Sequence, residues 1–364
     1  MAEFFASYGL FLLKVLTFVV AILIIMFAAF AMGSRGKKAG ADGKIEITKL
    51  NEQYDDMRES LSFSLLDDEA QKLALKEKKA EEKKERKANK EAAKKAKKQR
   101  GDGETLVNET TQKRIFVMDF DGDIRASEVD NMRKEISAIL TSASSDDEVV
   151  LRLESGGGMV TSYGLAASQL DRLKQKKVPL TICVDKVAAS GGYMMACVAD
   201  KLIAAPFAVL GSIGVVAQIP NFHRLLKKFN IDFEMLTAGK FKRTLTMFGE
   251  NTDEGRNKFI EDIERIHAQF KQYVNERRPQ LDIEAVATGE IWSGQDVLDK
   301  NLADQLSTSD AYLMDKCDSA EVILVKYKKK KSMSERFSIG IQDTADGLLM
   351  RAIDRMMKAR LSIG

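Results

Sequence analysis

Histidine, cysteine and tryptophan are scarce in this chain of 364 residues, which has two, three and one of them, respectively. So few histidines leave little material for metal chemistry or for histidine-based catalysis. The cysteines, Cys183, Cys197 and Cys317, are odd in number and lack CxxC spacing. The sequence therefore predicts neither a disulfide framework nor a zinc ribbon, and we expect no metal and no other cofactor.

The chain as a whole also lacks a large excess of either charge, since its formal net charge is +3. Residues 69–100, however, hold 14 Lys or Arg against 6 Asp or Glu, whereas the rest of the chain holds 43 against 48. No aromatic residue interleaves these lysines, which argues against specific nucleic-acid binding. We expect a solvated, helical stalk, and attraction to anionic lipid headgroups is the functional alternative.

A run without charge lies near the N-terminus, where residues 15–32 read VLTFVVAILIIMFAAFAM. This length can cross a bilayer, so we predict a single transmembrane helix. A cleaved signal peptide is the alternative because Ala29 and Ala31 form an A-x-A pattern, but the start of the chain lacks a basic region. Four Lys or Arg residues follow between positions 35 and 44, and by the positive-inside rule they place the rest of the chain in the cytoplasm.

These changes of composition divide the chain into four segments. We predict an anchor at 1–35, a helical, Lys/Glu-rich stalk at 36–103, a globular domain at 104–326, and a basic C-terminal tail or helix at 327–364. A hydrophobic fraction of 45% permits a real core and excludes wholesale disorder. Within the stalk, which looks helical from residue 47, an apolar stripe at helical spacing predicts packing against a partner helix: Leu50, Tyr54, Met57, Leu61 and Leu65.

Short β-branched runs alternate with amphipathic stretches in the globular domain. The runs RIFVMDF, VVLRLES and LTICVD are each followed by a helical pattern, near residues 127–139, 161–173 and 191–198. This alternation predicts an α/β fold with a largely parallel sheet and helices packed on it. Functional sites in such folds lie in the loops that follow the carboxyl ends of the strands.

Two unusual loops follow predicted strands. Residues 154–158 read ESGGG, and the three glycines expose backbone N–H groups that can bind an oxyanion or a phosphate, with a plain tight turn as the alternative. Ser190 lies between another strand and an apolar helix, which makes it a candidate nucleophile with the N–H of Gly191 as an oxyanion donor. An N-cap serine is the simpler interpretation.

A serine nucleophile needs a base, and neither histidine lies in such a loop. His223 and His267 have helix-like, charged neighbours, which is typical of surface or partly packed residues. A lysine whose pKa is lowered by burial is the remaining option. Residues 210–216 (LGSIGVV) and 237–244 (TAGKFKRT) supply a further hydroxyl and two lysines, but spacing alone does not select among the many lysines.

Four motifs in a fixed order resemble one known family. They are SGGGMV, DKVAASGGYMMACVADKLIAAPFAVLGSIGVV, TAGKFKRTLT and TGEIWSGQDVLDKNLAD, and over nearly its whole length the chain resembles the signal peptide peptidase A family of membrane-bound serine proteases. The resemblance implies a fold related to those of ClpP and crotonase, with ββα-type repeats and a parallel sheet. It also implies hydrolysis of peptide bonds by a Ser-Lys dyad, ring-like homo-oligomers and a single-pass location in the bacterial inner (plasma) membrane.

Carried over by position, the resemblance assigns a role to five residues of the peptidase domain. Ser190 matches the nucleophile, and Lys242, 52 residues downstream, matches the general base. Ser212 matches the hydroxyl that orients the lysine. Gly158 and Gly191 match the residues whose N–H groups form the oxyanion hole.

The chain departs from the family pattern in two places. Residues 155–158 read Ser-Gly-Gly-Gly where the family usually has Ser-Pro-Gly-Gly, which exchanges a rigid φ for a permissive one. Asn301 stands where the family has glycine, a change that a left-handed conformation tolerates. The family's active site often faces the non-cytoplasmic side, in conflict with the positive-inside rule, so both orientations stay open.

The leading prediction is a membrane-anchored serine endopeptidase. Its predicted partners are peptide substrates, such as signal-peptide or membrane-protein fragments, the lipid bilayer and further copies of the chain. A crotonase-like acyl-CoA enzyme is an alternative, with Glu154 as the only acidic group next to the glycine loop. A non-catalytic membrane scaffold, which would use the apolar stripe and the stalk to assemble partners, is another.

Overall fold

The computed structural model describes residues 14, 17, 43–67, 69–71 and 113–329. Ile45–Lys326 forms one compact unit, and Met1–Lys44 together with Tyr327–Gly364 forms the other. The predicted anchor, except Lys14 and Thr17, and most of the stalk and C-terminal tail lie outside the described residues. Within the described ranges no helix is both long and apolar enough to cross a membrane.

A largely parallel sheet forms the centre of the larger unit. Its strands follow one another in the order β1 (Lys44–Lys49), β10 (Glu321–Lys328), β2 (Arg114–Gly122), β3 (Glu148–Ser155), β4 (Leu180–Val184), β6 (Lys201–Ala204) and β9 (Gln305–Leu306). The pairs from β10 to β9 along this path are all parallel. The predicted α/β fold with a parallel sheet is therefore confirmed, and each predicted strand begins within two residues of the observed one.

A second branch of the sheet leaves the end of β3. Strand β3 pairs with β4 through Val149–Arg152 but with β5 (Val187–Ala189) through Ser155. Strand β5 also pairs in parallel with β7 (Val209–Gly211), and β7 pairs antiparallel with β8 (Ile291–Trp292). This branch brings the loops after β3, β5 and β7 to one place.

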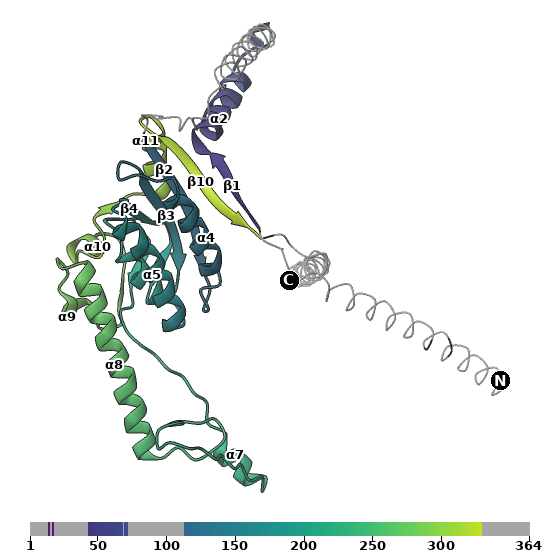
Figure 1. The fold of residues 1–364 in the computed structure, drawn as a ribbon, viewed down its shortest axis with the longest axis vertical. Coiled ribbons are helices and arrows are strands. Elements are labelled where there is room, and N and C mark those ends of the chain that lie inside the picture. The colour runs from purple at the N-terminus through teal and green to yellow at the C-terminus, as the bar shows by residue number, and fades with distance from the viewer. Residues whose placement is uncertain (1–13, 15–16, 18–42, 68, 72–112, 330–364) are drawn as a thin grey trace, which may run out of the picture. The chain divides into compact units, whose positions relative to one another are not determined.

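The two faces of the sheet carry different helices. Phe116, Met118 and Phe120 of β2 belong to the core that includes α4 (Val129–Leu140), α5 (Val160–Gln175) and α6 (Gly191–Ala196). The alternate residues Ile115 and Val117 belong to a smaller core with Leu50 and with Leu313 of α11 (Ser309–Cys317). Side chains of a strand point alternately to its two faces, so β2 is buried on both. Figure 1 shows α4 and α5 side by side against the sheet.

The beginning of the predicted stalk belongs to this unit. Residues 44–49 form the edge strand β1 beside β10, and the helix α2 (Leu50–Ser64) begins only at Leu50. The Asn51 side chain donates to the carbonyls of Cys317 and Ala320, which fixes the start of α2 on α11. The stripe therefore has its partner helix only at Leu50 and Tyr54, whereas its other three residues, Met57, Leu61 and Leu65, are more than half exposed.

An extended segment, residues 214–252, separates β7 from α8 (Asp253–Arg277). We call it the arm; it contains α7 (His223–Lys228), and none of its residues is buried. The last turns of α8 pack on the body of the unit through Phe270 and Val274, while the first turns carry the arm (Figure 1). Two short helices, α9 (Ile283–Val286) and α10 (Gln295–Asp299), follow α8.

Candidate active site

Ser190 lies in a sharp turn between β5 and α6. Its backbone has φ 52° and ψ −118°, a conformation that residues other than glycine rarely adopt. The turn is held because the Ser190 N–H donates to the carbonyl of Gly211 at 2.8 Å and the Met194 N–H donates to the Ser190 carbonyl at 3.0 Å. Ser190 occupies the N-cap position of α6, as the simpler interpretation of the sequence had it, but its hydroxyl makes no capping hydrogen bond. A strained strand-to-helix turn of this kind presents a serine as a nucleophile.

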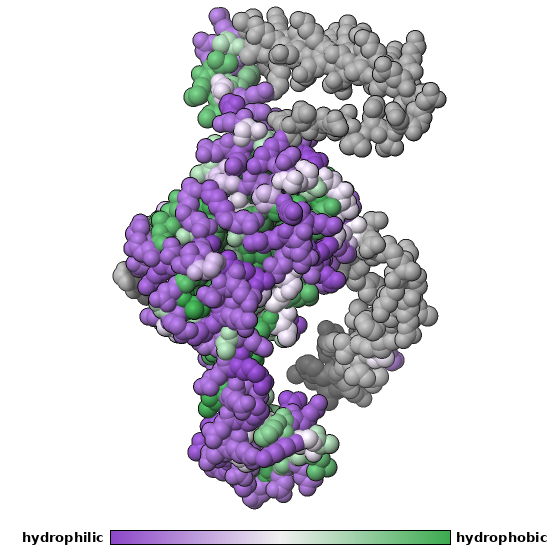
Figure 2. Space-filling view, turned by 60° about the vertical axis from the view of Figure 1, so that its left-hand side comes forward, coloured by the Kyte–Doolittle hydropathy of each residue, from purple (hydrophilic) through white to green (hydrophobic). Residues whose placement is uncertain are grey.

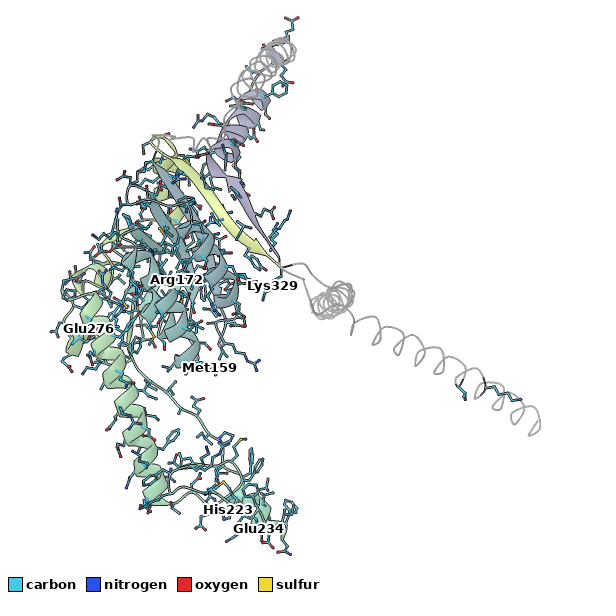
Figure 3. All side chains as sticks on the ribbon, viewed as in Figure 1. Met159, Arg172, His223, Glu234, Glu276 and Lys329 are labelled. Atoms are coloured by element: carbon cyan, nitrogen blue, oxygen red, sulfur yellow. The ribbon has the colours of Figure 1, made fainter. Side chains whose placement is uncertain are left out.

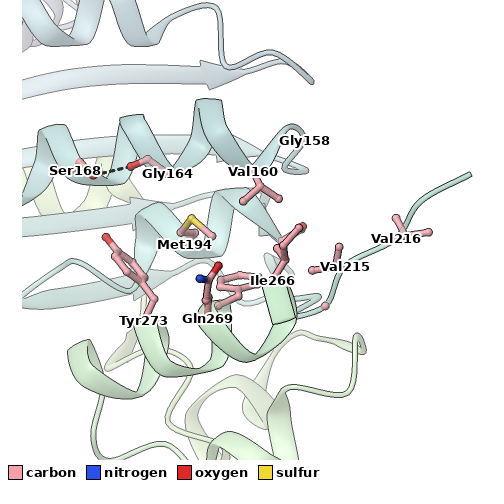
Figure 4. Close-up of a pocket in the computed structure, with 14 residues that line it drawn as sticks. Gly158, Val160, Gly164, Ser168, Met194, Val215, Val216, Ile266, Gln269 and Tyr273 are labelled. Carbon is pink, nitrogen blue, oxygen red and sulfur yellow. Dashed lines mark hydrogen bonds between the residues drawn. The ribbon is translucent and has the colours of Figure 1, made fainter. Parts of the chain in front are cut away.

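A cavity of about 390 Å³ opens beside this turn. Ser190, Gly158 and Gly191 all line it, so the structure brings the candidate nucleophile and both candidate oxyanion donors together. Most of the other lining side chains are apolar and come from α5, α6, α8 and the start of the arm: Val160, Met194, Val215, Val216, Ile266, Phe270 and Tyr273. Figure 4 shows Met194 of α6 opposite the α8 side chains of Ile266 and Tyr273. Such a site accepts a largely apolar ligand next to Ser190.

In the glycine loop, residues 154–158, two glycines have no room for a side chain. A Cβ on Gly157, whose φ is +86°, would lie 2.7 Å from the Gly191 nitrogen and 2.8 Å from the Ser190 Cβ. A Cβ on Gly158 would overlap the backbone carbonyl of Ile124. Gly156, in contrast, has open space on its Cβ side. The loop is thus more than a plain tight turn, because it is built against the nucleophile turn.

Ser212 follows β7, the strand next to β5. It has the same φ of 52° as Ser190, and its N–H donates to the carbonyl of Glu290 at 2.6 Å. Because Gly211 accepts the Ser190 N–H, Ser212 is separated from the nucleophile turn by one backbone hydrogen bond. Ser212 is half-buried and is not part of the cavity lining.

Lys242 lies apart from this group. It is exposed in the arm, in a turn where its N–H donates to the Gly239 carbonyl, and the neighbouring Lys240 forms an ion pair with Glu254 of α8. Glu254 precedes the cavity residue Ile266 by twelve residues on the same helix, which is about 18 Å along the helix axis. Within one chain the structure therefore does not bring Lys242 to Ser190. In Figure 3, Met159 at the start of α5 marks the side of the cavity and His223 marks the arm, and the two lie well apart.

Neither histidine takes the place of this lysine in the structure. The His267 ring lies on α8 with its Nε2 3.2 Å from the Ile213 carbonyl, and the His223 ring lies in the arm with its Nδ1 3.3 Å from the Phe248 carbonyl. Neither of these two contacts involves Ser190. His267 nevertheless fixes the loop that follows Ser212, a contact that no sequence pattern indicated.

None of the described side chains that line the cavity is a thiol or a carboxylate. Burial raises the pKa of the Cys183 and Cys197 thiols to about 12, so neither is a thiolate near neutral pH. Glu154, which the acyl-CoA alternative needs, lines a different cavity and pairs with Lys186 at 2.9 Å. In the part of the chain that the structure describes, no three His, Cys, Asp or Glu side chains are grouped to hold a metal ion.

A nucleophile turn beside glycine N–H groups is an arrangement found in hydrolases that form an acyl-enzyme. The model of the family "Peptidase family S49 N-terminal" matches residues 3–170, and that of "Peptidase family S49" matches residues 172–322. The chain therefore belongs to peptidase family S49, and the family resemblance predicted from its motifs is confirmed. Family membership makes it a protease.

Two proteins that are similar to this chain over nearly its whole length are named SohB. A "Probable protease SohB" of Haemophilus influenzae is 50% identical to this chain over 96% of each of the two chains. Another, from Buchnera aphidicola subsp. Acyrthosiphon pisum, is 46% identical over 95% of this chain and 96% of its own. SohB is also the branch of the family that the sequence resembles in its motifs and in its predicted anchor and stalk.

Proposed function

We propose that the chain is a membrane-anchored serine endopeptidase, with Ser190 as nucleophile and Lys242 as general base. The observation that carries this proposal is the strained turn at Ser190, which opens on an apolar cavity next to Gly158 and Gly191. The uncharged run at 15–32 would be its anchor in the bacterial inner membrane.

The reaction proceeds through an acyl-enzyme. The Ser190 Oγ attacks the carbonyl carbon of the scissile bond, and its proton passes to the neutral amine of Lys242. The N–H groups of Gly158 and Gly191 stabilise the resulting oxyanion, each by about 3 kcal/mol. The lysine then gives its proton to the leaving amine, and a water molecule, deprotonated by the same lysine, hydrolyses the ester.

Lys242 reaches Ser190 from the arm of a second copy of the chain. A second copy is needed because the arm turn that carries Lys242 lies about 18 Å along α8 from the cavity of its own chain. A lysine acts as a base only as a neutral amine, and burial in an apolar cavity favours the neutral form. The cavity of the second copy, lined largely by apolar side chains, provides that environment.

The surface of the arm supports assembly of several copies. A monomeric protein rarely exposes so many hydrophobic side chains within 39 residues. Figure 2 shows hydrophobic surface at this end of the unit. The exposed hydrophobic side chains of the arm are Val216, Ile219, Phe222, Leu225, Phe229, Ile231, Phe233, Met235, Leu236, Phe241, Met247 and Phe248. A homo-oligomer covers them and completes each active site from two chains.

Apolar peptide segments are the expected substrates. Val160, Met194 and Phe270 give the cavity an apolar lining next to the nucleophile, which suits signal-peptide remnants or membrane-protein fragments. The order β4–β5–α6, two strands and a helix that presents the nucleophile, also supports a fold related to those of ClpP and crotonase.

Hydrolysis of an apolar reporter peptide by the purified full chain tests the dyad. Ser190→Ala and Lys242→Ala are each expected to reduce kcat to background while leaving the thermal unfolding temperature unchanged. Lys228→Ala, a change of an exposed lysine elsewhere in the arm, is the matched control and retains wild-type activity. Full activity of either dyad variant would refute the mechanism.

The side of the membrane is tested with a serine-directed phosphonate that does not cross bilayers. Labelling of Ser190 on intact spheroplasts places the peptidase domain outside the cytoplasm, and labelling only after lysis places it inside. Ser190→Ala is the control that must stay unlabelled in both conditions.

A further inference from the structure

Tyr163 lies underneath the candidate oxyanion hole. This α5 residue is fully buried, and its ring packs directly against Gly191, because a Cβ on Gly191 would lie 2.5 Å from the Tyr163 Cγ. The ring therefore supports the backbone that presents the Gly191 N–H. Tyr163 is not part of the cavity lining and does not touch a ligand bound there.

The hydroxyl of Tyr163 connects the glycine loop to the segment after β2. It donates to the Asp123 carbonyl at 2.7 Å, and its oxygen lies 2.5 Å from the Ser155 Oγ. Since its only hydrogen goes to Asp123, the Ser155 hydroxyl donates to Tyr163. The Ser155 Oγ in turn accepts the N–H of Gly157 at 3.0 Å. Three hydrogen bonds in series thus run from the glycine loop through Tyr163 to the backbone at Asp123.

The far end of this series returns to the second oxyanion donor. Ile124 follows Asp123, and its carbonyl accepts the Met159 N–H at 2.8 Å. The same carbonyl lies where a Cβ of Gly158 would be, so Gly158 rests on Ile124. Tyr163 therefore contacts the surroundings of both donors. Its hydroxyl holds the segment on which Gly158 rests, and its ring packs against Gly191.

We propose that Tyr163 is a positioning residue for the oxyanion hole, which fixes the Gly158 and Gly191 N–H groups relative to each other through the Ser155 and Asp123 hydrogen bonds. The proposal rests on the serine-peptidase function above. Its consequence is that loss of one buried hydroxyl, outside the cavity, weakens stabilisation of the transition state and leaves substrate binding in place.

Tyr163→Phe keeps the ring and removes the hydroxyl. We expect kcat for the reporter peptide to fall by about 10- to 100-fold, because a small displacement of an oxyanion donor has an effect of this size, with KM within about twofold of wild type. The inhibition constant of a matching peptide aldehyde, whose adduct with Ser190 places an oxygen in the hole, should rise by the same factor.

Tyr312→Phe is the matched control. It also removes a tyrosine hydroxyl that hydrogen-bonds within the fold, to Glu148, but it lies on α11 and lines neither the cavity nor the glycine loop. It should leave kcat and the aldehyde constant unchanged even if it lowers the unfolding temperature. An equal fall of kcat in both variants, or an unchanged aldehyde constant in Tyr163→Phe, would overturn the proposal.

Ser155→Ala provides a second, independent test of the same series of hydrogen bonds. It removes both the donor to Tyr163 and the acceptor for Gly157, so it should lower kcat in the same range. The double variant should lose no more than the larger single effect, whereas fully additive losses contradict a shared series. If Tyr163→Phe fails to fold, Ser155→Ala alone decides. Ser190→Ala separates the two levels: its full activity refutes the peptidase mechanism, whereas an inactive Ser190→Ala with a fully active Tyr163→Phe refutes only the positioning role.

Discussion

The backbone N–H of Ser190 donates to the carbonyl oxygen of Gly211 across 2.8 Å. Strand β7 thereby holds the nucleophile turn, and the residue after Gly211 is Ser212, whose φ of 52° equals that of Ser190. Two serines with the same positive φ thus follow two neighbouring parallel strands. This relationship joins the backbone of the proposed base-orienting residue to the turn that carries the proposed nucleophile.

Ser212→Ala tests the orienting role. The change keeps the backbone and removes the hydroxyl, so we expect kcat to fall by about tenfold because the lysine is less well held. The rate of phosphonate labelling should fall by the same factor, since both reactions need the Ser190 proton to be removed. Ser319→Ala, at an exposed turn, serves as control. Wild-type rates in Ser212→Ala would rule the role out.

Alanine substitutions along the glycine loop should have opposite effects at adjacent positions. Gly156→Ala has space and a φ outside the left-handed region, so it should keep activity and raise the unfolding free energy by about 0.4–1 kcal/mol. Gly157→Ala and Gly158→Ala should lose activity because their methyl groups overlap Ala189 and Ile124. Kinetics and urea unfolding measure both quantities, and equal activity losses at 156 and 158 would contradict the described loop.

Asn301 is a position where the conformation expected from the sequence is observed. Its φ is 54°, the left-handed region, as proposed for an asparagine in place of the family glycine. Asn301→Gly should therefore change the unfolding free energy by only a few tenths of a kcal/mol, whereas Asn301→Ala should lower it by about 1 kcal/mol. Urea midpoints compare the two variants directly. Equal stability of both would mean that the conformation carries no strain.

The buried carboxylate of Glu148 predicts a pH-dependent stability difference. Burial by itself raises its pKa, but hydrogen bonds from Tyr312 at 2.5 Å and Thr181 at 2.8 Å, with nearby lysines, hold the pKa below its ordinary value. Such a group stabilises the fold above its unfolded-state pKa and loses this contribution as pH falls through its folded-state pKa.

Tyr312→Phe weakens this arrangement. At pH 7 the variant should unfold at a lower temperature than the wild type, and the difference should shrink as the pH is lowered from about 5 to 3. Unfolding temperatures at a series of pH values measure it. A difference that stays constant over this range would show that the Glu148 charge is not involved.

Much of the fold follows from local patterns in the sequence. RIFVMDF and VVLRLES are recognisable because strands buried on both faces are nearly all apolar or β-branched, and the observed strands extend them by only a few residues. The edge strand β1 was missed, because its six residues, KIEITK, carry charges and run directly into a helical stripe. Its place in the sheet depends on pairing with β10, nearly 280 residues later, which no local pattern records.

Only part of the candidate site could be predicted from the sequence. Ser190, Gly158 and Gly191 meet because each follows a strand of one connected sheet, and that rule could be applied to the sequence. The separation of Lys242 from them was not predictable, because the arm has a core-like content of apolar residues but no buried side chain. Tyr163 was also missed, since its role depends on hydrogen bonds to residues eight and forty positions earlier.

In the proposed mechanism, Ser190 and Lys242 of different copies form each active site. Full-length Ser190→Ala and Lys242→Ala chains, each inactive alone, are co-expressed with different tags, and the mixed oligomers are purified in detergent through both tags. Random mixing around a ring gives about a quarter of the sites an intact serine and an intact neighbouring lysine, so we predict about a quarter of wild-type activity. Mixed oligomers no more active than either variant alone, beside an active mixture of wild type and Ser190→Ala, would contradict the claim.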